Sequence, residues 1–78
     1  MYLEINPPYY HDKILINTDQ ITAVCMITDP RTFDIRLYFT SAVYGEERKF
    51  LVLSFKNATD REVVYDKIRS FLNAVTFE

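Results

Sequence analysis

The sequence predicts an α+β fold, in which an antiparallel sheet of four to five strands precedes one C-terminal amphipathic helix. Short stretches with β-branched or alternating apolar residues are separated by turn residues, and a single apolar stripe at helical spacing follows them. The length of 78 residues is that of one small domain. We therefore expect a single domain over residues 1–78, with the sheet either open or curled into a half-barrel.

Five stretches have the composition or the alternation of β-strands. The first two flank Pro7-Pro8, which breaks regular structure. Asp29-Pro30 has the residue order of a type I turn and separates the third stretch from the fourth, and a turn is expected around Gly45. The strands are predicted over residues 2–5, 13–16, 20–28, 33–40 and 49–56.

Alternation within these strands assigns one face of the sheet to the core. Neighbouring strands must pair odd-numbered with odd-numbered residues, so the loops around Pro30 and Gly45 need an odd length or a bulge. Cys25 is then a small buried apolar residue and not a reactive thiol. The predicted core residues of the sheet are Ile21, Ala23, Cys25, Ile27, Phe33, Ile35, Leu37, Phe39, Leu51, Leu53 and Phe55.

The helix is predicted over residues 60–73. Thr59 and Glu62 have the spacing of a capping box, in which each side chain accepts a hydrogen bond from the other residue's backbone N–H. The apolar residues after the cap recur at helical spacing and form one stripe, which we expect to cover the core face of the sheet. The stripe consists of Val64, Ile68, Phe71, Leu72 and Val75.

The second face of the predicted sheet is also apolar, although a solvated antiparallel face is normally polar. Leaving several large side chains in water forgoes about 25 cal/mol per Å² of apolar surface. The cover is expected to come from curling of the sheet into a half-barrel, from the N-terminal segment, from a second copy of the chain in a homodimer, or from another protein. The predicted partner-binding residues are Val24, Met26, Tyr38, Phe50 and Val52.

The composition argues against most catalytic and cofactor sites. One glycine cannot build a phosphate-binding loop, and one histidine with one cysteine cannot build a four-ligand zinc site. His11 follows a Pro-Pro turn, and no two carboxylates are marked as an acid–base pair. We therefore expect no enzyme activity, no cofactor and no metal.

Charge and hydropathy narrow the expected partners and location. The net charge is −2, from nine basic and eleven acidic residues, which disfavours nucleic acid and anionic membranes as partners. The longest apolar runs are far shorter than the ~20 residues of a membrane helix, and the first residues do not resemble a signal peptide. A single cysteine suits a reducing compartment, so a cytoplasmic location is expected.

The residues from Lys49 to Glu62, followed by Ile68, Phe71 and Leu72, resemble the last strand and C-terminal helix of pleckstrin-homology-like domains. The resemblance covers about a third of the chain and implies a binding module without catalysis. Our prediction is a non-catalytic protein-interaction or regulatory module that self-associates or binds another protein through the second face. The alternative is single-stranded nucleic-acid binding on the sheet, where aromatic rings stack beside cations. Its residues would be Arg36, Tyr38, Lys49 and Lys56.

Overall fold

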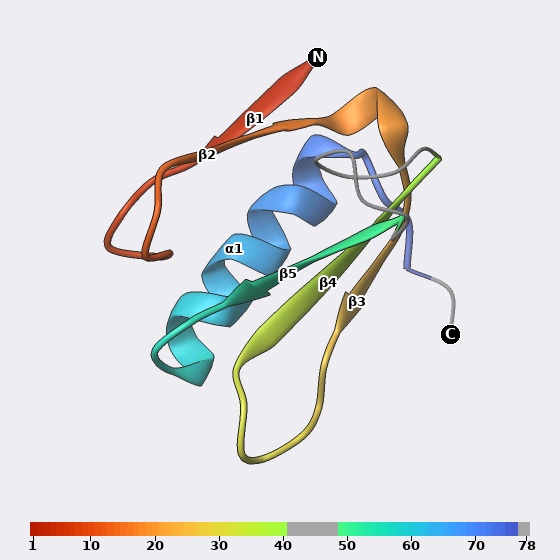
Figure 1. The fold of residues 1–78 in the computed structure, drawn as a ribbon. Helices are drawn as coiled ribbons and strands as arrows, with labels where there is room; N and C mark the ends of the chain where they lie inside the picture. The colour runs from red at the N-terminus through yellow and green to blue at the C-terminus, as the bar shows by residue number, and fades with distance from the viewer. Residues whose placement is uncertain (41–48, 77–78) are drawn as a thin grey trace.

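The computed structural model describes residues 1–40 and 49–76. It confirms an α+β fold of antiparallel strands with one C-terminal α-helix (Figure 1). The predicted turn around Gly45 lies outside the described residues. In chain order the elements are β1 (Tyr2–Ile5), β2 (Ile14–Asn17), the 3-10 turn η1 (Thr18–Gln20), β3 (Ile21–Met26), β4 (Asp34–Phe39), β5 (Phe50–Ser54) and α1 (Ala58–Phe71).

The strands form two sheets, so the prediction of a single sheet with four to five strands is wrong. β1 and β2 make a two-stranded antiparallel hairpin, and the other three strands pair in the order β3-β4-β5. The hairpin buries Ile5 and Ile16 in the common core instead of extending the larger sheet. At its open end, the carbonyl of Met1 accepts hydrogen bonds from both the backbone N–H and the hydroxyl of Thr18, each 2.9 Å long.

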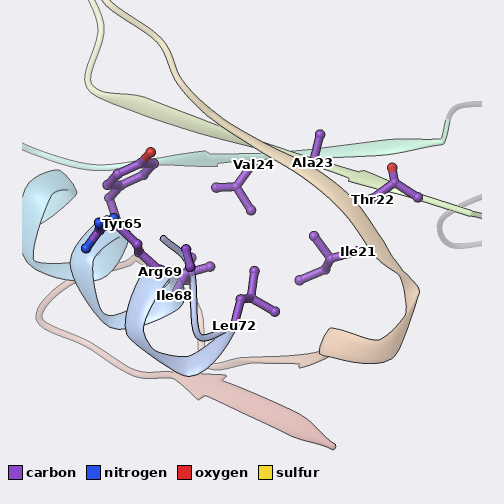
Figure 2. Close-up of a pocket in the computed structure, with 9 residues that line it drawn as sticks. Ile21, Thr22, Ala23, Val24, Tyr65, Ile68, Arg69 and Leu72 are labelled. Carbon is purple, nitrogen blue, oxygen red and sulfur yellow. The ribbon is translucent and has the colours of Figure 1, made fainter. Parts of the chain in front are cut away.

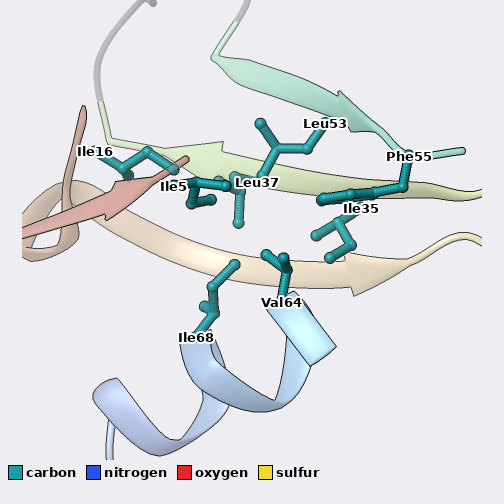
Figure 3. Close-up of a cluster of buried hydrophobic side chains, with 8 residues drawn as sticks. All are labelled: Ile5, Ile16, Ile35, Leu37, Leu53, Phe55, Val64 and Ile68. Carbon is teal, nitrogen blue, oxygen red and sulfur yellow. The ribbon is translucent and has the colours of Figure 1, made fainter. Parts of the chain in front are cut away.

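The core lies between the three-stranded sheet, the helix and the hairpin. Ile35, Leu37 and Leu53 from the sheet are fully buried, and Val64 and Ile68 of α1 pack against them. Figure 3 shows these side chains converging with Ile5 and Ile16 of the hairpin. The hairpin and α1 therefore lie on the same face of the sheet. The buried apolar residues of this core are Ile5, Ile16, Ile35, Leu37, Leu53, Phe55, Val64 and Ile68.

The helix begins two residues before the predicted start. Its N-cap is Asn57, whose side-chain oxygen accepts a 2.8 Å hydrogen bond from the backbone N–H of Asp60. The predicted capping box at Thr59 is wrong, because the N-cap is Asn57 and Thr59 lies inside the first turn of the helix. At the other end, Asn73 adopts a positive φ of 58° and Ala74 donates its N–H to the Arg69 carbonyl, which forms a Schellman motif.

The register confirms odd-with-odd pairing between β4 and β5, where Leu37 lies opposite Leu51. Between β3 and β4 that prediction is wrong. A β-bulge between Ile21 and Ala23 inserts Thr22 as an extra residue, so Val24 lies opposite Leu37 and Met26 opposite Ile35. Because side chains alternate along a strand, the bulge exchanges the two faces of β3 from Ala23 onward.

Candidate functional site

The face of the three-stranded sheet that is turned away from α1 is the first candidate site, and we call it the outer face. Its side chains come from even-numbered residues of β4 and β5 and odd-numbered residues of β3. Cross-strand pairing arranges them in rows, since directly opposed residues share a face. One row is Ala23, Tyr38 and Phe50, and the next is Cys25, Arg36 and Val52.

Arg36, Tyr38 and Phe50 form a contact cluster on the outer face. The Arg36 Nη1 donates a 3.2 Å hydrogen bond to the Tyr38 hydroxyl, and its guanidinium carbon lies 5.1 Å from the Phe50 ring centroid. The Tyr38 and Phe50 rings are tilted, with centroids 5.9 Å apart. The hydrogen bond from Arg36 to the Tyr38 hydroxyl raises the pKa of Arg36 further, so the cluster carries a permanent positive charge.

The predicted partner-binding residues divide between two faces. Tyr38, Phe50 and Val52 lie on the outer face, where each is partly buried. Val24 and Met26 lie on the helix side, because the bulge at Thr22 reverses the alternation that the sequence pattern suggested. The prediction that these five residues share one face is therefore wrong for Val24 and Met26.

Cys25 is exposed, and so is Ala23. The prediction that both are core residues is wrong for the same reason, because each lies after the bulge and opposite an outer-face residue of β4. An exposed thiol is accessible to reagents, although its reactivity also depends on the thiolate fraction.

The N-terminal segment does not cover the outer face. Tyr9 and Tyr10 pack against the core on the helix side, and the Tyr10 and Phe55 ring centroids are 5.7 Å apart. The Lys67 ammonium of α1 lies 4.9 Å from the Tyr9 ring centroid, which ties the same segment to the helix. The N-terminal segment was one of the covers expected for the second face, and within the described residues it packs on the opposite side of the sheet.

A groove between β3 and the C-terminal half of α1 is the second candidate site. Its volume is about 270 Å³, and Figure 2 shows Ile21 and Val24 of β3 pointing into it toward the helix. The helix contributes Tyr65, Ile68 and Leu72 to its walls. The sequence analysis missed this groove, because the direction of the Val24 side chain depends on the bulge.

The residues of the nucleic-acid alternative are only partly brought together. Arg36 and Tyr38 are in contact on the outer face. Lys49 and Lys56 lie just beyond the two ends of β5 (Phe50–Ser54). Seven steps of about 3.3 Å along a strand place their Cα atoms about 23 Å apart. The three cations therefore do not form one basic patch within this part of the chain.

Within residues 1–40 and 49–76, no group of three or more His, Cys, Asp or Glu side chains is placed to hold a metal ion. Within those ranges, no helix combines the length and apolar character needed to cross a lipid bilayer. Comparisons with protein-family models, curated proteins and solved structures found no match.

Proposed function

We propose that this protein is a non-catalytic protein-interaction module whose outer face binds a partner protein. The proposal depends on one observation. The α1 helix and the β1–β2 hairpin both pack on the same face of the β3-β4-β5 sheet, and no other described element covers the opposite face. In the described part of the chain, this opposite face carries apolar and aromatic side chains, which is unusual for a surface that faces only water.

The chemistry of the outer face favours a protein partner. Arginine and aromatic residues are enriched at protein interfaces and dominate their binding energy. Arg36 is held by Tyr38 and Phe50, so little of its side-chain freedom remains to be lost on binding. Cys25 and Val52 on either side of Arg36 add apolar contact area. A partner with apolar residues around a carboxylate or carbonyl group would complement this surface.

The resemblance to pleckstrin-homology-like domains supports the same class of function. Its residues lie in β5 and α1, and it implies a binding module without catalysis. Nucleic acid is the weaker alternative, because single-strand binding needs cations along a continuous track, and Lys49 and Lys56 lie far from each other. A protein partner needs only the central cluster.

Site-specific photo-crosslinking in living cells tests the proposal. A benzophenone amino acid replaces Val52 on the outer face, and in the matched control it replaces Glu62, an exposed residue of α1. We expect recurrent protein adducts from position 52 that are absent from position 62 and are reduced when Arg36→Ala is added. Equal adducts from both positions, or none from position 52, would contradict the proposal.

A further inference from the structure

β3 is an edge strand with a free hydrogen-bonding side. It pairs with β4 only, and no described strand lies along its other edge. The Ile27 N–H donates a 3.0 Å hydrogen bond to the Asp34 carbonyl, which places Ile27 on the side of β4. The N–H and C=O groups of successive residues point alternately to the two sides of an antiparallel strand. Those of Cys25 therefore also point to β4, and those of Val24 and Met26 point away from β4, to the free edge of the sheet.

The sequence of β3 lacks the residues that usually protect a free strand from pairing. Edge strands are normally blunted by lysine or other charges, by proline, or by coverage. β3 has the sequence Ile-Thr-Ala-Val-Cys-Met, which contains no charged residue, proline or glycine. Its bulge at Thr22 distorts only the first half of the strand, and residues 23–27 keep a regular register with β4.

The regular part of the edge is complementary to itself. Its midpoint is Cys25, and outward-pointing backbone groups lie symmetrically on either side of that residue, at Val24 and Met26. We propose that β3 pairs antiparallel with β3 of a second copy of this chain, about a two-fold axis at Cys25. Val24 of each copy then forms a hydrogen-bonded pair with Met26 of the other, which is an isologous contact.

The groove beside β3 supports a second copy as the occupant. Opposed residues share a face, so Met26 of the second copy lies beside Val24 on the helix side. That position is at the groove lined by Ile21, Val24 and Tyr65. Methionine is unbranched and flexible, and it fills irregular apolar spaces well. The same pairing thus gives hydrogen-bond partners to the backbone groups of Val24 and Met26 and places an apolar side chain in the groove.

This inference goes beyond the proposed function, because it concerns the edge of the sheet and not the outer face. Pairing through β3 would join two three-stranded sheets into one with six strands, and the two outer faces would become continuous. A failure of the pairing would leave the photo-crosslinking test at Val52 unaffected, so the two proposals can fail separately.

Mass measurement by light scattering, in reducing buffer at about 100 µM chain, is the first test. We expect twice the chain mass of 9.3 kDa. Cys25→Lys and Cys25→Glu should each weaken dimerisation at least about tenfold, because like charges would stand opposite each other. An equimolar mixture of the two variants should regain the dimer. Val52→Lys, two strands away from the edge, should leave it intact.

Disulfide formation tests the register. A non-hydrogen-bonded pair at Cys25 brings the two Cα atoms to about 4.5 Å, within the range of a disulfide. Diamide, which accepts the two electrons and two protons, should link wild-type chains rapidly and leave Cys25→Ser unlinked. A monomer at 100 µM would overturn the proposal. Three other results would also overturn it: a dimer that persists in Cys25→Lys, a dimer that is lost in Val52→Lys, and a dimer that diamide does not crosslink.

Discussion

The Arg36 guanidinium and the Tyr38 hydroxyl are joined by a hydrogen bond between alternate residues of β4, on the face of the sheet away from the helix. The same guanidinium lies near the Phe50 ring of β5. The Tyr38 hydroxyl and the Phe50 ring therefore hold this cation in position on the outer face. An incoming carboxylate or carbonyl group would therefore meet an oriented donor.

Replacing Tyr38 by phenylalanine removes the acceptor and keeps the ring. We expect the free energy of unfolding to fall by no more than about 1 kcal/mol, since a net hydrogen bond contributes about that much. Photo-adducts from position 52 should fall more clearly, because Arg36 loses its orientation. Urea unfolding and crosslinking measure the two effects, and Tyr2→Phe, at a residue that is 59% exposed, is the control.

The N-cap at Asn57 predicts that alanine substitutions at positions 57 and 59 differ in their effect on stability. Asn57→Ala removes the oxygen that accepts from the Asp60 N–H and should destabilise the protein by about 1 kcal/mol. Thr59→Ala, inside the first turn and exposed, should change stability by less than about 0.5 kcal/mol. Chemical denaturation of both variants checks this, and a larger loss for Thr59→Ala would show that the helix is capped at Thr59.

Two leucines, one buried and one exposed, test the position of the core. Leu37 is fully buried, so Leu37→Ala should destabilise the fold by about 2–5 kcal/mol through lost burial and a cavity. Leu15 is 62% exposed, and Leu15→Ala should cost less than about 0.5 kcal/mol. Thermal and urea unfolding distinguish the two variants, and similar losses would be inconsistent with this core.

Asp29 should titrate below the ordinary aspartate pKa of about 3.9. The Arg31 side chain lowers the pKa most, followed by the hydrogen bond from the Arg31 backbone N–H. The resulting stabilisation is present above the unfolded-state pKa and is lost as the pH falls through the folded-state pKa. Carboxyl NMR titration should show this midpoint, and Arg31→Gln should raise it. An unchanged midpoint in Arg31→Gln would exclude the side-chain contribution.

A short single-stranded oligonucleotide should not bind. The three cations named for that function do not form one basic patch, and the chain has a net charge of −2. Fluorescence anisotropy at low salt, with protein up to about 50 µM, is the measurement. Saturable binding that Arg36→Ala abolishes would favour the nucleic-acid alternative over a protein partner.

The positions of the strands and the helix could be predicted from local patterns alone. Alternation located β4 and β5 and their buried residues, because each side chain's direction follows directly from the backbone period. The division into two sheets could not be predicted, since it depends on how the β1–β2 hairpin packs against α1. The directions of Val24, Met26 and Cys25 were also out of reach, because nothing local in Ile21-Thr22-Ala23 distinguishes a bulge from a regular strand.

The extra residue at Thr22 makes β3 tolerant of a deletion at that one position. Without Thr22, Ile21 and Ala23 would be consecutive residues opposite Phe39 and Tyr38, and the strand would alternate regularly. Val24 and Met26 would still face the helix. Deleting Val24 would instead place Cys25 opposite Leu37 and turn Met26 toward the outer face, so a shortened chain should be tolerated at Thr22 and not at Val24.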